Sequence, residues 1–177
     1  MLDDARSFAV TAHGSQMYGA KPYVFHLDAV VGLLTPYGVE AQIVGYLHDV
    51  VEDTAVTEDE VRKRFGHLVG ECVSLLTDAP GANRAERKAG TYARLATVAG
   101  PGELALVVKA ADRLANVRSC VVDQRCGLWG VYRSEHAAFR RAAYREGLCD
   151  PLWAELDALL DTASDAGSRS DQGSTDV

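Results

Sequence analysis

The sequence predicts an all-α protein, and three observations support this fold class. Apolar residues recur at helical spacing, as in Leu152, Leu156, Leu159 and Leu160 near the C-terminal end. No segment shows sustained alternation of apolar and polar residues, so we expect no strands. Glycine and proline divide the chain into lengths that suit short helices, and residues 57–60 (Thr-Glu-Asp-Glu) form a capping box.

In the first half of the chain we expect helices over residues 2–12, 23–34, 39–51, 57–66 and 67–76. The long connection after the first helix is a loop, because Gly14, Gly19 and Pro22 interrupt helical spacing there. Pro36 and Gly38 close the second helix. The capping box opens the fourth helix, and the fifth has apolar residues at helical spacing.

In the second half we expect helices over residues 83–99, 101–117, 134–145 and 151–160. Pro80 and Gly81 separate the first of these from the preceding helix, and Pro101 opens the next one in a favoured first-turn position. Residues 1–163 therefore form one domain. Residues 164–177 contain almost nothing apolar, and we expect a disordered polar tail there.

The composition is that of a soluble globular protein, since 47% of the 177 residues are apolar and 24% are charged. No apolar stretch is long enough to span a bilayer, and the acidic start lacks the basic region of a signal peptide, so we expect a cytoplasmic protein. The four cysteines form no C-x-x-C pair and are expected to be reduced. The net charge of −7 disfavours nucleic acid as a partner. The sequence leaves the oligomeric state open.

The segment from His48 to Thr54 carries the strongest chemical signal. It places four titratable side chains within six residues, directly behind an apolar run. On a helix, residues four apart share a face, so His48 would lie over Glu52 and Asp49 over Asp53. Core packing does not explain this group, because ionised carboxylates are rarely buried without a partner. The arrangement predicts a metal held by His48 and Asp49, with Glu52 and Asp53 as an acid/base pair.

Two further residues complete a ligand set. One is His26, on the expected second helix. The other is Asp112, which forms a polar stripe with Lys109 and Asn116 along an otherwise apolar segment. A row of polar side chains on an otherwise buried helix must contact hydrogen-bonding partners or line a cavity. The predicted ligands of a single ion are therefore His26, His48, Asp49 and Asp112.

Two imidazoles and two carboxylates suit Mn²⁺, Fe²⁺ or Zn²⁺ better than Ca²⁺. Four protein ligands on an octahedral ion leave two positions for water or substrate. Each residue also has an ordinary explanation: His26 as a core histidine, Asp112 as the partner of a nearby arginine, Glu52 and Asp53 as charges at a solvated helix end. The joint pattern favours the metal.

An anionic substrate would need a local basic patch in this acidic protein. Residues 84–88 (Arg-Ala-Glu-Arg-Lys) are the densest basic stretch, although a solvated helix face explains them equally well. The candidate phosphate-binding residues are Lys21, Arg84, Arg87, Lys88 and Lys109.

Several motifs occur in order over roughly residues 5–120. They are His13-x-x-Gln16, Pro22-Tyr23-x-x-His26, His48-Asp49-x-x-Glu52-Asp53-Thr54, Phe65-Gly66, Leu76-Thr77 and Lys109-x-x-Asp112-Arg113-Leu114-x-Asn116-x-Arg118. This series resembles the HD-superfamily hydrolase domain of RelA/SpoT alarmone enzymes, and in size the stand-alone small alarmone hydrolases. The resemblance implies an HD-type helical bundle with a central metal site, one divalent ion (usually Mn²⁺), and removal of the 3′-pyrophosphate from guanosine tetra- or pentaphosphate.

The resemblance also implies roles for individual residues. The four predicted ligands match the metal ligands of the family, and Glu52 and Asp53 match its catalytic pair. Asn116 matches a residue that contacts the nucleotide near the ribose and phosphate. The family's loop before Pro-Tyr usually carries an arginine, often followed by a lysine, that holds the guanine. Here the loop is shorter and has no arginine, but Tyr18 could stack on a base.

Three functions follow as hypotheses. The first is a metal-dependent pyrophosphohydrolase of guanosine alarmones. The second is a phosphohydrolase of another nucleotide, such as a nucleoside monophosphate or NADPH, which would release orthophosphate instead of pyrophosphate. The third is a metal-binding regulatory module without turnover, which would have little need of Glu52 and Asp53.

Overall fold

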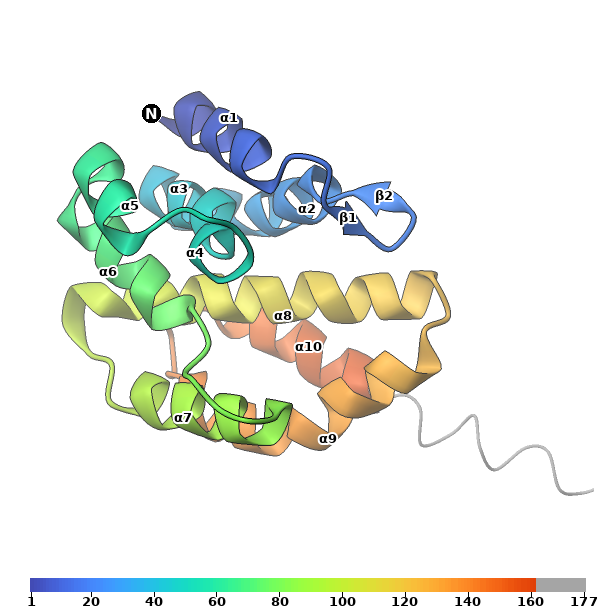
Figure 1. Ribbon diagram of the computed structural model, residues 1–177. Coiled ribbons are helices and arrows are strands. Elements are labelled where there is room, and N and C mark those ends of the chain that lie inside the picture. The colour runs from blue at the N-terminus through green and yellow to red at the C-terminus, as the bar shows by residue number, and fades with distance from the viewer. Residues whose placement is uncertain (162–177) are drawn as a thin grey trace, which may run out of the picture.

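The computed structural model describes residues 1–161 and confirms the predicted all-α fold (Figure 1). The first half contains α1 (Leu2–His13), β1 (Met17–Tyr18), β2 (Lys21–Pro22), α2 (Val24–Leu34), η1 (Thr35–Tyr37), α3 (Val39–Leu47), α4 (Val50–Asp53), α5 (Glu58–Phe65) and α6 (His67–Leu76). The second half contains α7 (Arg84–Ala96), η2 (Gly100–Glu103), α8 (Leu104–Val122), α9 (Cys126–Ala143) and α10 (Asp150–Asp161). The predicted tail over 164–177 lies outside the described residues.

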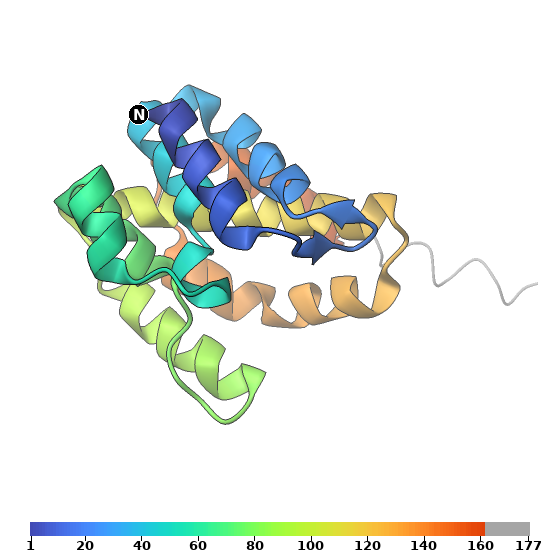
Figure 2. The ribbon, with the colours of Figure 1, turned by 45° about the horizontal axis from the view of Figure 1, so that its top comes forward.

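Helix α8 crosses the middle of the molecule, and other helices pack on it from both sides (Figures 1 and 2). Helices α2, α3 and α6 contact one side, and α9 and α10 contact the other. The helix takes this central place because Leu106, Val108 and Leu114 are fully buried in the core. Two polar residues of the same helix, Lys109 and Asp112, are therefore carried into the interior between the two groups of helices.

A hairpin of two strands, each two residues long, lies in the connection between α1 and α2. Met17 pairs with Pro22 and Tyr18 with Lys21 in an antiparallel ladder. This corrects the expectation of no strands, because a strand of two residues is too short to show alternation in the sequence. The hairpin lies beside the C-terminal end of α8, where Tyr18 reaches that helix (Figure 1).

The expected continuous helix over 39–51 is wrong at one point. Helix α3 ends at Leu47 and α4 begins at Val50, so His48 and Asp49 lie at a break between two helices. In a regular helix, adjacent side chains point roughly 100° apart. The break lets both side chains turn toward the same place, with Nε2 of His48 only 2.9 Å from Oδ2 of Asp49.

The remaining helices agree with the prediction in type but differ at their ends. The capping box is confirmed, since Oγ1 of Thr57 accepts from the Glu60 N–H and the Glu60 carboxylate accepts from the Thr57 N–H. Helix α9 starts at Cys126 rather than at 134, because Gly127 and Gly130 obscure the helical pattern. Helix α7 ends at residue 96 rather than 99, and the segment expected over 101–117 opens with a 3₁₀ turn and continues to 122. Among residues 1–161, no helix has the length and apolarity needed to cross a bilayer.

Candidate metal centre and active site

The four predicted ligands converge from three parts of the chain: α2, the α3–α4 break and α8. Nε2 of His48 lies 2.9 Å from Oδ2 of Asp49 and 3.6 Å from Oδ1 of Asp112. Nε2 of His26 lies 3.4 Å from the same Asp112 oxygen and 3.8 Å from the Asp49 oxygen. Both imidazoles are buried, and the two carboxylates are mostly so. The side chains of His26, His48 and Asp49 therefore form a group that could hold a metal ion, and Asp112 lies beside it.

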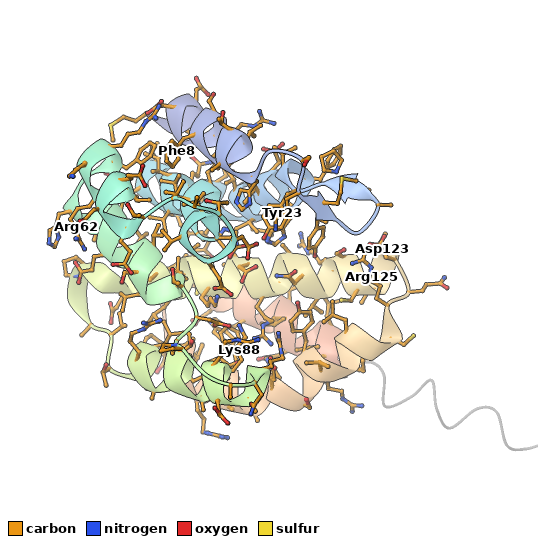
Figure 3. The ribbon with its side chains drawn as sticks, in the orientation of Figure 1. Phe8, Tyr23, Arg62, Lys88, Asp123 and Arg125 are labelled. Carbon is orange, nitrogen blue, oxygen red and sulfur yellow. The ribbon has the colours of Figure 1, made fainter. Side chains whose placement is uncertain are left out.

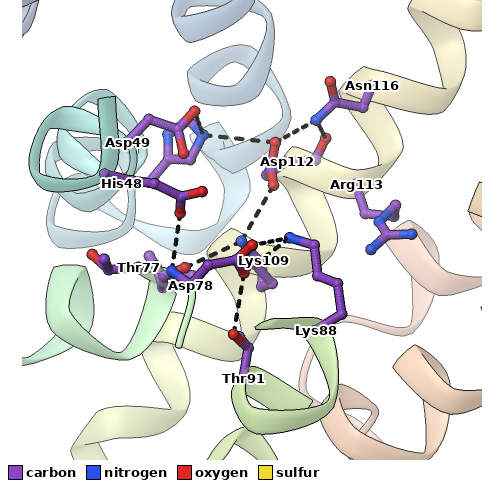
Figure 4. A network of polar contacts seen from close by, with 12 residues as sticks. His48, Asp49, Thr77, Asp78, Lys88, Thr91, Lys109, Asp112, Arg113 and Asn116 are labelled. Carbon is purple, nitrogen blue, oxygen red and sulfur yellow. Dashed lines mark hydrogen bonds and ion pairs between the residues drawn. The ribbon is translucent and has the colours of Figure 1, made fainter. Parts of the chain in front are cut away.

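The hydrogen bonding of His48 tests whether this point suits a cation. Its Nδ1 lies 2.7 Å from the backbone carbonyl oxygen of Gly45, which can only accept, so Nδ1 carries the proton. Nε2 of the neutral ring is then an acceptor, and it is buried without a hydrogen-bond partner within residues 1–161. It nevertheless faces the oxygens of Asp49 and Asp112 (Figure 4). Acceptors repel one another unless a proton or a cation lies between them, so the residues fit a metal ion.

The charges of the cluster lead to the same conclusion. Burial opposes the charge on His48, but the carboxylates of Asp49 and Asp112 raise its pKa well above the ordinary value. Burial likewise opposes the two carboxylates, yet the imidazoles hold the pKa of both carboxyls below the ordinary range. The carboxylates that favour a proton on Nε2 of His48 when no ion is present would favour a divalent ion in place of that proton, because metal ligation requires the neutral imidazole.

A layer of hydrogen bonds holds the carboxylate ligands in place. The hydroxyl of Tyr23 donates to Oδ2 of Asp49 at 2.5 Å. The amide of Asn116 donates to Oδ1 of Asp112 at 2.6 Å (Figure 4). The side-chain oxygen of Asn116 accepts from the Tyr18 hydroxyl at 2.8 Å. Tyr23, near the centre of Figure 3, was not among the predicted site residues, although it follows Pro22 in a recognised motif. Such partners orient ligands before an ion binds.

The predicted catalytic pair lies on α4, and its two carboxylates have different partners. Glu52 accepts a 3.0 Å hydrogen bond from the Asp78 backbone N–H, and burial raises the pKa of its carboxyl. Asp53 accepts a 2.9 Å hydrogen bond from the side-chain amide of Gln16, whose oxygen lies 2.8 Å from Nδ1 of His13. The two carboxyls therefore have different environments, because burial raises the pKa of Glu52 while Asp53 accepts a hydrogen bond from an amide.

A cleft of about 170 Å³ opens above the ligands, and its basic lining residues are Arg84, Lys88, Lys109 and Arg113. The Lys88 ammonium lies 2.8 Å from Oδ2 of Asp78, which fixes it over the cleft (Figure 4). The Lys109 ammonium is buried 3.7 Å from Oδ2 of Asp112 and donates to the Leu76 carbonyl. Four cations in one cleft of an acidic protein suit a phosphorylated substrate.

The structure places the predicted substrate-binding residues unequally. Those that line the cleft with the ligands and the catalytic pair are Tyr18, Lys88, Lys109 and Asn116. Lys21 lines a neighbouring cavity, and Arg87 lies in the lining of neither. One face of the Tyr18 ring stacks on His26 at a centroid distance of 4.7 Å, so that face is not open to a base.

Sequence reasoning missed one further lining residue, Tyr132, and one residue that supports the lining, Asp78. Tyr132 lines the cleft from α9, but it was missed because that helix was expected to begin only at residue 134. Asp78, which anchors Lys88 and Thr91, follows the motif Leu76-Thr77 and could have been found from its position there.

The fold and the site together define a helical protein with a buried group of two histidines and an aspartate that could hold a metal ion, beside Asp112. A family model described as "HD domain" matches residues 5–149, so the chain belongs to the HD domain family. Its similarity to curated proteins includes a guanosine-3′,5′-bis(diphosphate) 3′-pyrophosphohydrolase of Aquifex aeolicus, 31% identical over 137 residues, and a probable one of Synechocystis, 33% identical over 118. These matches cover 76% and 63% of this chain but only 18% and 16% of those proteins.

Two solved structures share the fold. A metazoan ortholog of SpoT that hydrolyses ppGpp aligns with a TM-score of 0.73 at 24% identity, covering 92% of this chain and 94% of that one. A Listeria monocytogenes protein aligns with a TM-score of 0.66, also at 24% identity, covering 81% and 96%. At this identity the likeness establishes the helical architecture.

Proposed function

We propose that the protein is a divalent-metal-dependent hydrolase that removes the 3′-pyrophosphate from guanosine tetra- and pentaphosphate. The observation that carries the proposal is the convergence of four ligand atoms beside Glu52 and Asp53 under a cleft with four basic side chains. The pyrophosphohydrolases named among its relatives support this substrate class.

The ligands in this proposal are His26, His48, Asp49 and Asp112, and the ion is Mn²⁺. A mixed nitrogen and oxygen set favours Mn²⁺ over Ca²⁺. When bound, a divalent ion acts as a Lewis acid toward water and phosphoryl oxygens. The four free cysteines, Cys72, Cys120, Cys126 and Cys149, suit the cytoplasmic location that the sequence predicts.

The chain's own groups then divide the proton transfers. Water attacks the phosphorus attached to the ribose 3′-oxygen, and Asp53, held as an acceptor by Gln16, takes the water proton. The bond between that phosphorus and the 3′-oxygen breaks. Glu52, whose pKa is raised by burial, gives its proton to the leaving 3′-oxygen. Pyrophosphate results, together with the nucleoside 5′-diphosphate from the tetraphosphate or the 5′-triphosphate from the pentaphosphate.

The basic residues neutralise and position the phosphates. Lys88 and Lys109 line the cleft beside the ligands, and we propose that they contact the transferred pyrophosphate. Asn116 acts through Asp112 and at the ribose side of the cleft. Lys21 and Tyr18 lie toward the cavity that would take the nucleoside, whereas Arg87 lies outside both linings and is given no substrate contact in this proposal.

The test is incubation with a panel of phosphorylated nucleotides and Mn²⁺, followed by chromatography of the products. The proposal predicts pyrophosphate release from guanosine tetraphosphate and loss of turnover in the double variant Glu52→Gln, Asp53→Asn with metal still bound. Orthophosphate from NADPH or a nucleoside monophosphate would identify a different substrate. Metal binding without turnover of any nucleotide would identify a regulatory module.

A further inference from the structure

A second cavity, of about 540 Å³, adjoins the polar cleft and shares Tyr18 and His26 with it. Its apolar lining residues are Ala20, Phe25, Ala29, Leu33, Ala115 and Val122. Walls of this kind suit a flat, largely apolar group such as a nucleobase. A base held here would place its attached phosphates toward the metal cluster, and this step rests on the proposed function.

Three basic side chains line the cavity, and they differ in how many of their donors are engaged by partners. Arg118 donates two hydrogen bonds of 2.6 Å to the Glu155 carboxylate. Lys21 lies on the exposed hairpin, and its ammonium is 5.9 Å from the ring centroid of Phe25. This bidentate pair engages Nε and Nη2 of Arg118 and joins α8 to α10, so fewer of its donors remain for a ligand.

Arg125 makes fewer polar contacts than Arg118. Its guanidinium lies 5.8 Å from the ring centroid of Tyr18 and forms an ion pair of 3.1 Å with Asp123, and a third of the side chain is exposed. One such contact leaves most of its five N–H donors available. Both Asp123 and Arg125 lie at the corner between α8 and α9, close to the hairpin (Figure 3).

The hairpin is shaped to admit this guanidinium. Gly19 has a φ of +63°, and a Cβ built on it would lie 1.8 Å from Nη2 of Arg125, far inside van der Waals contact. At the corner, Gln124 has a φ of +53°, and the Arg125 N–H donates to the Cys120 carbonyl at 2.8 Å. The local backbone at both segments therefore brings the arginine to the edge of the cavity.

We propose that Arg125 is a specificity-determining residue that reads the substrate's base as guanine. A guanidinium presents paired donors that match two adjacent acceptors. Guanine offers O6 and N7 on one edge, whereas adenine has an amino group in place of O6. The shortened hairpin carries no arginine of its own, and the α8–α9 corner supplies one to the same cavity.

The experiment compares kcat/KM for guanosine tetraphosphate and its adenosine analogue in four proteins. They are the wild type, Arg125→Met, Gly19→Ala and Gly100→Ala. Arg125→Met should lower the value for the guanine substrate by roughly 10- to 100-fold and leave the adenine substrate within about twofold. Gly19→Ala should cause the same loss by displacing the guanidinium. Gly100 has the same φ of +63° with no neighbour within 4 Å, so Gly100→Ala should keep the preference.

An equal loss for both nucleotides, or no loss in Arg125→Met, would overturn the proposal. A binding measurement separates this outcome from failure of the proposed hydrolysis. By calorimetry, the wild type should bind GDP more tightly than ADP, and Arg125→Met should bind both equally. If the wild type hydrolyses neither tetraphosphate but shows this GDP preference, the assignment of Arg125 stands and the proposed reaction fails. If GDP and ADP bind the wild type equally, the assignment of Arg125 fails whatever the turnover.

Discussion

The hydroxyl of Tyr23 donates a 2.5 Å hydrogen bond to Oδ2 of Asp49, the oxygen that also lies 2.9 Å from Nε2 of His48. The Tyr23 ring is itself stacked on His13, with centroids 4.4 Å apart. The start of α2 therefore holds a predicted ligand at the α3–α4 break. This contact orients the carboxylate in the folded protein before an ion binds.

Replacing Tyr23 with Phe should weaken Mn²⁺ binding by about 10- to 100-fold, because the ligand loses its orienting hydrogen bond. Calorimetric titration of the metal-free protein measures the change. Tyr46→Phe is the matched control, since it removes a 3.1 Å hydrogen bond to Asp28, which is not among the four ligands. Similar weakening in both variants would show that the effect is not specific to the metal centre.

Replacing Glu52 with Gln should reduce turnover by at least about 100-fold, because Gln cannot transfer a proton. The same change should make the metal-free protein more stable at neutral pH. Burial raises the pKa of Glu52 above its ordinary value of 4.5 in the folded protein, so its ionisation above that value costs stability. Gln keeps an acceptor for the Asp78 N–H and avoids that cost.

The sign of the Glu52 effect follows from linkage. A carboxyl with a raised folded-state pKa favours folding at pH values below its unfolded pKa, and this contribution is lost as the pH rises through the folded pKa. Urea unfolding at a series of pH values from 4.5 upward should therefore show Glu52→Gln gaining on the wild type as the pH rises. A stability difference that is constant with pH, or one that shrinks, would contradict the assignment.

Replacing Arg84 with Met should lower kcat/KM for a phosphorylated substrate by roughly 10- to 100-fold, as expected for loss of a charged hydrogen bond. Arg84 lines the cleft, and its partner Glu135 keeps Arg113 at 3.1 Å in the variant. Arg87→Met is the matched control on the same helix, because Arg87 lies outside the lining. We expect a change of less than about threefold there. A larger effect at Arg87 would favour the phosphate role that the sequence predicts for it.

Replacing Thr57 with Ala should lower the free energy of unfolding by about 1 kcal/mol, because α5 loses its capping box. Thr57→Ser should retain most of that stability, since it keeps the hydroxyl. Neither variant should change hydrolysis at saturating metal, because Thr57 does not line the cleft. Urea unfolding and a rate measurement on the same samples test both statements.

The sequence predicts best what lies on regular elements. His26 and Asp112 could be proposed because each stands on a largely apolar helix where a polar side chain needs a partner. The break at His48 and Asp49 could not be predicted, because apolar residues continue at Val50 beyond it and the sequence gives no sign that α3 ends. Helical periodicity reports which face is buried but not where hydrogen bonding is interrupted.

The residues that sequence reasoning missed depend on contacts between distant segments. Arg125 reaches the hairpin only because the α8–α9 corner folds back toward Gly19, more than a hundred positions earlier. Tyr132 enters the cleft from a helix whose first turns contain Gly127 and Gly130. No local sequence pattern predicts these long-range contacts, which arise from the packing of α8 and α9.

The most direct test of the account is the position of bound Mn²⁺, measured by anomalous scattering from crystals grown with the ion. The account predicts one ion per chain, coordinated by Nε2 of His26 and His48 and by carboxylate oxygens of Asp49 and Asp112. An ion bound at other residues, or no ion at saturating Mn²⁺, would contradict it.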